Sequence, residues 1–387
     1  MRLARRPLAC LLLLAWLGAC APRPPASWLG APTAIAPGVE LYRTGDESLV
    51  EGIGPIAVNL LRLDPRRVYL ASALGNDRIA EAETVAGIAE RRHALAAING
   101  GYFNRSNGEP VAVLKVAGQL VSDSSAAKGA VIISAPSSSE MRLVFDRLSA
   151  KLTMNCTAGT ATWTVPIDGV DTTRARGKLM LYTPAYSRDT GTAPTGIEWV
   201  LDGEPLRVVA VRQHAGRTPI PVSGAVLSFG GSEPPPSLAA LAPDVQVTFT
   251  TNWKSARGVP AAELDHAEHI VNGAGLLRWA GKVVTDWKDE ALSVDAFVEA
   301  RHPRTMIGVD KRGFVWLLAV DGRQPDYSIG MKFSDLQRLA DRLELTDALN
   351  LDGGGSTTMV AAGRVVNRPS DPTGARPVAD AIVVLPR

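Results

Sequence analysis

The chain has 387 residues, of which 46% are hydrophobic and 21% are charged. This length and apolar content suit one large folded domain or two ordinary ones, and they exclude a disordered chain or a coiled coil. The formal net charge of +2 becomes slightly negative without the three arginines near the N-terminus. We therefore do not expect the protein to bind nucleic acid through its phosphates.

The N-terminal stretch has the composition of a secretory signal. Three arginines precede an apolar run at residues 8–17, which is too short to span a bilayer. The run ends in Leu-Gly-Ala before Cys20, an order that resembles a bacterial lipobox. We predict a lipoprotein signal peptide over residues 1–19 and lipidation of Cys20. A plain signal peptide that happens to contain this cysteine is the alternative.

Residues 20–38 are rich in proline and small residues, which predicts an extended tether before a folded domain at 39–387. Membrane attachment would then depend on the lipid anchor of Cys20. The expected location is the cell envelope, on the periplasmic face of the outer membrane if the organism has two membranes. Cys156 lies in an alternating, strand-like run, so we expect a buried structural thiol rather than a nucleophile.

Short apolar and alternating runs predict a domain rich in strands. Paired strands are expected at 56–63 and 67–74, and an apolar stripe predicts a helix over 79–92. A buried strand is expected at 95–98. The middle of the chain is a succession of short predicted strands, at 111–116, 130–134, 143–146, 179–182, 208–211 and 245–250.

The C-terminal third has more regular patterns. They predict a hairpin from strands at 305–309 and 314–320, a helix that begins with a capping pattern at Ser334, and a buried strand at 348–351. Together these elements predict an α+β fold, with mixed β-sheets, flanking helices and a β-rich middle part in a single domain.

Two segments in these regions have compositions suited to ligand binding. Residues 99–103 read Asn-Gly-Gly-Tyr-Phe, and glycines at a strand end let backbone N–H groups converge on a ligand oxygen. A plain turn explains this motif better when it is taken alone. Residues 301–305 and 321–323 carry three arginines, whose guanidinium groups suit a phosphate. A solvated cluster paired to acidic residues is the alternative.

A third segment, residues 349–358, reads Leu-Asn-Leu-Asp-Gly-Gly-Gly-Ser-Thr-Thr. Asp352 leaves a buried strand and meets three glycines and a run of hydroxyl groups, which brings a carboxylate and bare N–H groups together. No lysine follows the glycines, so a nucleotide-binding loop is disfavoured. A flexible glycine linker would not begin directly at a buried strand.

In this order the motifs resemble the phosphodiester glycosidase family. The resemblance runs from about residue 50 to the C-terminus and is clearest at 95–110 and 300–385, with closing segments at 367–369 and 376–378. It implies hydrolysis of the glycosidic bond of a sugar-1-phosphodiester, with release of the sugar. Arginines would hold the anion, while carboxylates would stabilise an oxocarbenium-like centre, activate water or act as nucleophile.

The motifs and the resemblance together define a candidate site. The predicted catalytic carboxylates are Asp352, Asp321 and Glu109, with their individual roles left open. The predicted substrate-binding residues are Asn99, Gly100, Gly101, Arg301, Arg304, Thr305, Arg323, Asn350, Gly353, Gly354, Gly355, Ser356 and Thr357.

We expect no cofactor and no metal site. His266 and His269 lack a third zinc ligand and are interpreted as part of a solvated helix. A divalent cation such as Ca²⁺ is not supported by any loop motif.

The expected partner is a glycosyl-phosphate, either a small molecule or a cell-surface polymer. The alternative is a non-catalytic envelope lipoprotein that binds anionic glycans or assists exopolysaccharide assembly. Several acidic groups among phosphate-binding arginines favour the hydrolase, because a pure binder of phosphate does not need them.

Overall fold

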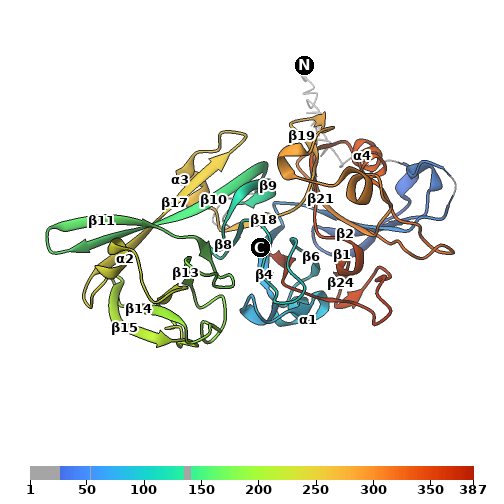
Figure 1. Ribbon diagram of the computed structural model, residues 1–387. Coiled ribbons are helices and arrows are strands. Elements are labelled where there is room, and N and C mark those ends of the chain that lie inside the picture. The colour runs from blue at the N-terminus through green and yellow to red at the C-terminus, as the bar shows by residue number, and fades with distance from the viewer. Residues whose placement is uncertain (1–26, 53, 135–140) are drawn as a thin grey trace, which may run out of the picture.

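The computed structural model of the protein describes residues 27–52, 54–134 and 141–387. Strands account for 44% of the residues and helices for 13%, and the strands curl into a nearly closed, barrel-like sheet. The predicted α+β fold is therefore confirmed only in part, because the fold is β-rich and its helices are short. Figure 1 shows two lobes, one formed by the middle of the chain and one by both its ends.

Two antiparallel sheets make up the lobe that contains both ends of the described chain. The eight-stranded sheet has the order β1 (Thr33–Ala36), β2 (Val39–Thr44), β3 (Val58–Leu63), β22 (Val315–Val320), β21 (Arg304–Asp310), β23 (Leu345–Asn350), β19 (Leu276–Trp279) and β20 (Lys282–Val283). The five-stranded sheet has the order β25 (Arg364–Val365), β24 (Met359–Ala361), β6 (Ala96–Asn99), β27 (Asp380–Pro386) and β4 (Val68–Leu74). A small pair joins β26 (Pro377–Val378) to β5 (Glu83–Thr84).

The other lobe is built on a twelve-stranded sheet. Its order is β12 (Gly169–Val170), β13 (Leu179–Tyr182), β16 (Ala225–Phe229), β14 (Gly196–Asp202), β15 (Arg207–Ala215), β17 (Gln246–Ser255), β10 (Leu143–Ala158), β9 (Ser124–Ile133), β18 (His269–Asn272), β7 (Leu114–Val116) and β8 (Gln119–Ser122), with β11 (Ala161–Pro166) paired to β10. The long β10 reaches across the lobe and pairs with three other strands. Cys156 is buried on this strand, as predicted.

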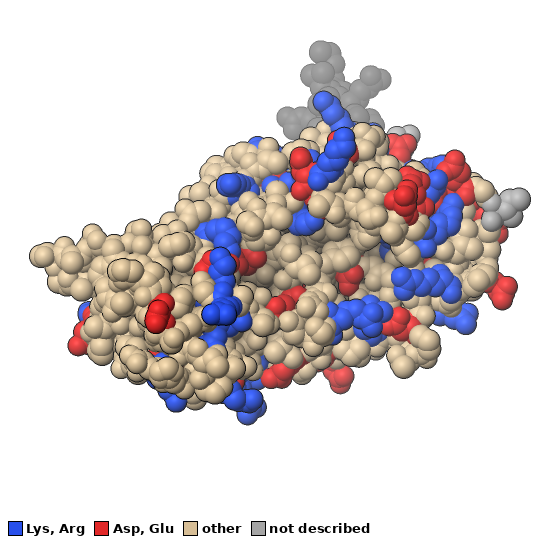
Figure 2. All heavy atoms as spheres, viewed as in Figure 1, with Lys and Arg blue, Asp and Glu red and all other residues tan. Residues whose placement is uncertain are grey.

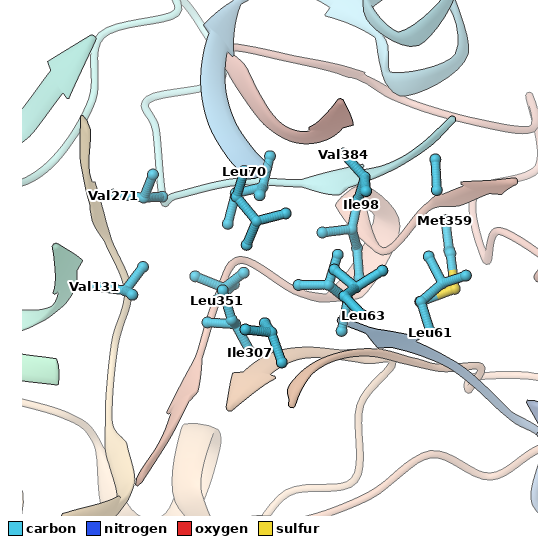
Figure 3. Close-up of a cluster of buried hydrophobic side chains, with 14 of the residues drawn as sticks. Leu61, Leu63, Leu70, Ile98, Val131, Val271, Ile307, Leu351, Met359 and Val384 are labelled. Carbon is cyan, nitrogen blue, oxygen red and sulfur yellow. The ribbon is translucent and has the colours of Figure 1, made fainter. Parts of the chain in front are cut away.

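The main core lies between the eight-stranded and five-stranded sheets. Figure 3 shows Leu61 and Leu63 from one sheet pointing toward Ile98 and Val384 from the other. All four side chains are essentially excluded from solvent, and burial of each stabilises the fold by about 1.5–3 kcal/mol. This packing brings the end of β6 close to the ends of β21 and β23, where the motifs lie.

Four α-helices are described, α1 (Val85–Arg91), α2 (Pro236–Ala239), α3 (Ala261–His266) and α4 (Phe333–Arg342), together with short helical turns. The helix α4 buries Leu336 and Leu339, as its apolar spacing predicts. It begins one residue before the predicted Ser334, because Asp335 accepts the backbone N–H of Lys332 at 3.2 Å. The helix predicted over 79–92 is confined to α1, where the Thr84 hydroxyl caps the first turn by accepting Gly87 N–H at 3.1 Å.

The paired strands predicted at 56–63 and 67–74 exist, but they do not pair with each other. β3 pairs with β2 and β22, whereas β4 pairs with β27 in the other sheet. The turn between them therefore carries the chain across the core from one sheet to the other. The hairpin predicted in the C-terminal third is confirmed as β21 and β22.

The folded region begins before the predicted boundary at residue 39. β1 pairs antiparallel with β2, and Leu29 is buried in a core cluster. The part of the predicted tether after residue 26 is thus packed on the domain. Its β1 strand extends the edge of the sheet, and its Leu29 side chain is buried in the core. The predicted signal peptide at 1–19 and Cys20 lie outside the described residues. Within the described ranges, no helix is long and apolar enough to cross a membrane.

Charges are distributed over the surface in a mixed pattern. Figure 2 shows acidic and basic side chains interspersed on one face, with a column of Lys and Arg beside the junction of the two lobes. An anionic ligand would approach this face most favourably at that junction.

Candidate functional site

Asn99, which belongs to the first sequence motif, forms hydrogen bonds to both of the other motifs. Its side-chain Nδ2 donates to the main-chain oxygen of Asp352 at 2.7 Å, and its Oδ1 accepts the Thr305 hydroxyl at 2.8 Å. The same Oδ1 also accepts the backbone N–H of Thr358 at 3.2 Å. These groups all lie at or within two residues of a strand end, so the bonds join the ends of β6, β21, β23 and β24 into a single polar site. Thr357 joins it through a 3.3 Å contact between its hydroxyl and that of Thr305.

Asp352 is the carboxylate at the centre of this site. Its Oδ1 accepts the backbone N–H of Gly353 at 2.9 Å, and its own N–H donates to the Gly100 carbonyl at 3.2 Å. Burial raises the pKa of Asp352 to about 6, against the opposing effects of the Ser356 hydroxyl, the Gly353 N–H and the nearby cations Arg376 and Arg105. The carboxyl is therefore mostly ionised at neutral pH but able to hold a proton just below it.

Arg376 packs against the glycine loop and was not among the predicted binding residues. Its Nε and Nη2 donate to Asp371 at 2.8 and 3.0 Å, and its Nη1 lies 3.5 Å from the Ser356 hydroxyl. A Cβ at Gly355 would lie 2.1 Å from Arg376 Nη2, so only glycine leaves room for this pair. The sole sequence signal was its place in the closing segment at 376–378.

Arg323 lies in the connection that follows β22, and its guanidinium approaches the same glycine loop. A Cβ at Gly354 would approach its Nη2 to 3.0 Å, and this Nη2 is 3.4 Å from His302 Nδ1. The side chain is exposed, and in the described part of the chain it has no acidic partner. Its φ of 60° is unfavourable for a residue with a Cβ, which indicates that the surroundings impose its position. Arg323 therefore offers an unneutralised guanidinium next to Gly354, in the loop that follows Asp352.

A second carboxyl, Asp380, was missed by the sequence analysis. Its Oδ1 accepts the Gly101 N–H at 3.1 Å, and a Cβ at Gly100 would lie 2.0 Å from its Oδ2. Burial, with a smaller contribution from the charge of Asp352, raises the pKa of Asp380 to about 7, against the opposing effect of the Gly101 N–H. The glycine pair is thus required because an acidic side chain fills the space beside it. The available signal was an acidic residue that opens the apolar run 380–386.

Asn350 positions a tyrosine at the site. Its Nδ2 donates to the Tyr102 hydroxyl and to the Ala274 carbonyl, both at 2.9 Å. The Tyr102 ring packs on Phe297 with centroids 5.9 Å apart. Burial and the neighbouring Asp352 charge raise the pKa of Tyr102 well above its usual value. Its hydroxyl therefore stays neutral and keeps a proton to donate.

Comparisons with known proteins find a family that matches the C-terminal half of the chain. The family model for phosphodiester glycosidase matches residues 195–385, which include Asp352, Arg323, Arg376 and Asp380. This segment belongs to the phosphodiester glycosidase family. The cattle N-acetylglucosamine-1-phosphodiester alpha-N-acetylglucosaminidase is 31% identical over 102 residues, which are 26% of this chain and 19% of the cattle protein. The human protein of that name has the same identity over the same length. The match thus spans about a fifth of these relatives.

Solved structures show the same fold over more of the chain. A hypothetical protein from Synechocystis has a TM-score of 0.73 at 22% identity and covers 91% of this chain and 62% of its own. A protein from Burkholderia pseudomallei K96243 has a TM-score of 0.71 at 24% identity, with 87% and 75% covered. At these identities the likeness shows the fold alone.

Two of the three predicted arginines are held by carbonyl or carboxylate partners, whereas Arg323 has only the His302 contact among the described residues. Arg304 is 2% exposed, and its guanidinium donates to the carbonyls of Met331, Ala300 and Phe297. Arg301 forms a 2.6 Å ion pair with Asp335 at the start of α4. Both arginines hold neighbouring loops in place, because buried carbonyls and a buried carboxylate require donors there.

The other two predicted carboxylates are also engaged. Asp321 is fully buried and accepts the Asn367 Nδ2 at 2.9 Å and the Arg368 N–H at 3.0 Å, while burial raises its pKa. Glu109 accepts the hydroxyls of Thr172 and Thr173 at 2.7 and 2.6 Å. Asp321 therefore anchors the closing segment, and Glu109 attaches the first motif's loop to the other lobe.

The predicted absence of a metal site stays a prediction. Across residues 27–52, 54–134 and 141–387, no three His, Cys, Asp or Glu side chains cluster as metal ligands. The interpretation of His266 and His269 as one solvated helix is wrong, because α3 ends at His266 and His269 is buried on β18. Burial lowers the pKa of His269 to about 4, and its Nδ1 accepts the Ala117 N–H at 3.3 Å.

Proposed function

We propose that the protein is a hydrolase that cleaves the glycosidic bond of a sugar-1-phosphodiester and releases the sugar. One observation carries this proposal: the same glycine loop holds the Asp352 carboxyl at Gly353 and has the Arg323 guanidinium next to Gly354. Membership of residues 195–385 in the phosphodiester glycosidase family supports the reaction class.

Arg323 supplies the anion site in this proposal. Its guanidinium is exposed and has no ion-pair partner among the described residues, so its charge is available to a phosphodiester. Charge builds up on the phosphate oxygens as the glycosidic bond breaks, and a fixed guanidinium stabilises that charge. Arg376 lies on the other side of the loop but shares its charge with Asp371. Phosphate is a good leaving group, so protonation by a strong general acid is not required.

Asp352 acts on the sugar side. When the bond between the anomeric carbon and the phosphate oxygen breaks, the electron pair leaves with the phosphate and the sugar becomes electron-deficient. The ionised Asp352 carboxylate either stabilises this centre and takes a proton from the attacking water, or attacks it directly. A pKa of about 6 suits both roles, because the carboxylate is ionised at neutral pH and still basic enough to accept a proton.

The loop carrying Asn99, Gly100 and Gly101 positions these groups. Asn99 holds the Asp352 main chain, and the Gly100 carbonyl accepts the Asp352 N–H. Tyr102 presents a neutral hydroxyl from the same loop. The Asp380 carboxyl accepts the Gly101 N–H, so Asp380 acts as a positioning residue for this loop.

The substrate would be a glycosyl-phosphate, free or within a cell-surface polymer, at the cell envelope. A lipid on Cys20 would hold the protein there. Replacement of this residue, Cys20→Ala, should move the full chain from the membrane fraction to the soluble fraction. Unchanged membrane association of the variant would contradict the anchor.

The reaction is tested by incubating the full chain with UDP-N-acetylglucosamine and with a methyl phosphodiester of the same sugar. We expect released sugar from at least one substrate, and Asp352→Asn should slow the release by about 100-fold or more. Asp326→Asn, an exposed acid on the Arg323 connection, is the matched control and should leave the rate unchanged. Full turnover by the Asp352 variant would remove the assignment. Saturable binding without any released sugar would favour the non-catalytic alternative.

A further inference from the structure

The middle lobe contains a cavity of about 820 Å³, a size typical of small-molecule sites. Its walls come from residues 173–177, from β13 and the segment up to Thr195, and from residues 229–233. Figure 1 shows β13 and β14 in the middle lobe, away from α4 and β21. Most of the wall precedes residue 195, so it lies outside the segment that matches the family. None of the residues around Asp352 lines this cavity.

A buried polar network centred on Glu198 of β14 adjoins the cavity wall. Its Oε1 accepts the hydroxyls of Thr190, Thr192 and Ser228 at 3.0, 2.7 and 2.8 Å, and the carboxylate is fully buried. Arg174 Nη1 lies 3.6 Å from the same oxygen and donates to Ser228 at 2.9 Å. Since Thr190, Thr192 and Arg174 also line the cavity, this network holds its walls at fixed positions.

Two buried polar groups near the cavity have no partner among the described residues. They are the Tyr182 hydroxyl and the Glu198 Oε2. Buried polar groups are nearly always hydrogen-bonded, so these two atoms, which are closed off from solvent, leave unmet hydrogen bonds behind the cavity wall. Tyr182 lines the cavity and packs against Tyr186 with ring centroids 4.7 Å apart. The partly buried Tyr186 therefore forms the aromatic wall of the cavity, with the buried Tyr182 ring behind it.

The charges at the cavity balance. Arg174 is paired with the buried Glu198, and one exposed residue of each sign, Arg176 and Glu233, lines the cavity. A site built for an anion would carry an excess of positive charge. Neutral hydroxyl groups, glycine main chain and an aromatic wall suit a ligand with hydroxyl groups on one side and apolar C–H faces on the other. We propose that this cavity is a second binding site, for a neutral oligosaccharide.

Glu109 connects this cavity to the loop beside Asp352. Its carboxylate accepts the hydroxyls of Thr172 and Thr173, and Thr173 lines the cavity. The loop that begins at Asn99 thus ends at the cavity rim. An oligosaccharide held there would lie at the far end of the same loop, which suits a glycan polymer. Binding in the cavity does not require hydrolysis, so the inference goes beyond the proposed function.

The test uses isothermal titration of the full chain with three neutral trisaccharides: triacetylchitotriose, maltotriose and cellotriose. We expect at least one to bind with a Kd in the millimolar range or tighter. Ala193 is exposed and lines the cavity, so Ala193→Trp should fill the space and weaken binding at least tenfold. Ala239→Trp adds the same side chain at an exposed position of α2 outside the cavity and should bind like wild type.

Two further variants keep the outcome decisive. Tyr186→Ala removes the aromatic wall and should also weaken binding at least tenfold, should Ala193→Trp not fold. Asp352→Asn should bind the trisaccharide like wild type even if all hydrolysis is lost, which separates this inference from the proposed function. The inference is overturned if none of the three sugars binds, if the cavity variants bind normally, or if inorganic phosphate displaces the sugar from the cavity.

Discussion

The side-chain Nδ2 of Asn99 donates to the main-chain oxygen of Asp352 at 2.7 Å, although the two residues are 253 positions apart in the chain. The bond ties the end of β6 in one sheet to the connection after β23 in the other. It fixes where the Asp352 carboxyl leaves the core, which makes Asn99 the residue on which the site geometry depends most directly.

Replacement of this amide, Asn99→Ala, should therefore damage both stability and activity. The Asp352 oxygen, the Thr305 hydroxyl and the Thr358 N–H would all lose a buried partner, at a cost of about 1–3 kcal/mol in unfolding free energy. Chemical denaturation and sugar release measure the two effects. Asn155→Ala removes an exposed side-chain hydrogen bond and should change stability by less than about 0.5 kcal/mol. Equal effects of both variants would contradict the central place of Asn99.

Arg304 and Arg323 should respond to alanine in opposite ways. Arg304→Ala strips donors from one buried and two partly buried carbonyls and should lower the unfolding free energy by about 3 kcal/mol. Arg323→Ala should leave stability nearly unchanged, because its side chain is exposed, and should raise KM about tenfold or more through the lost phosphate contact. Thermal denaturation and steady-state kinetics separate the two. A stable Arg304 variant with raised KM would restore that residue to the anion site.

The rate of sugar release should fall as the pH drops through about 6. The proposed roles of Asp352 need its ionised form, and protonation with a pKa of about 6 removes that form. The Arg105 charge lowers this pKa, so Arg105→Ala should move the acid limb of kcat/KM to higher pH. The exposed Arg364 lies on β25, and its alanine variant serves as control. A shift to lower pH in the Arg105 variant would be incompatible with the assignment.

The glycine at position 355 should not tolerate alanine. The added Cβ would lie 2.1 Å from Arg376 Nη2 and 2.2 Å from Asp371 Oδ1, which forces the ion pair apart. We expect Gly355→Ala to reduce kcat/KM by about 100-fold, since the loop carrying Ser356 must shift. Gly281→Ala meets nothing within 4 Å but has a φ of 79°, so it reports backbone strain alone. Activity retained in the first variant would show that the pair is not needed.

Asp171 should make the protein less stable as the pH rises. Burial raises the pKa of Asp171 from 3.8 to about 8, so the folded state binds a proton that the unfolded state releases. Its contribution to stability is complete below pH 4 and declines as the pH rises through 8. Asp171→Asn resembles the neutral form and keeps the polar contacts to Thr183. Its melting temperature should depend less on pH in this window than that of wild type, as differential scanning calorimetry would show. An unchanged pH dependence would contradict the buried proton.

Local sequence patterns determined most of the strands and the glycine motifs. A short apolar run predicted β13 at its observed bounds, and the glycines after a buried strand marked the Asp352 loop, because both signals lie within a few consecutive residues. The same patterns placed Asn99, Thr305, Asn350 and Asp352 in a common site. Those four residues do come together.

The tertiary structure alone decided which charged groups remain available to a ligand. Arg304 and Arg323 are alike in sequence, but one is buried against carbonyls and the other stays exposed beside Gly354. Asp380 and Arg376 enter the site only because β27 and its preceding loop return beside β6. Contacts between residues this distant in the chain depend on how the sheets pack, and the local pattern of apolar residues does not predict that packing.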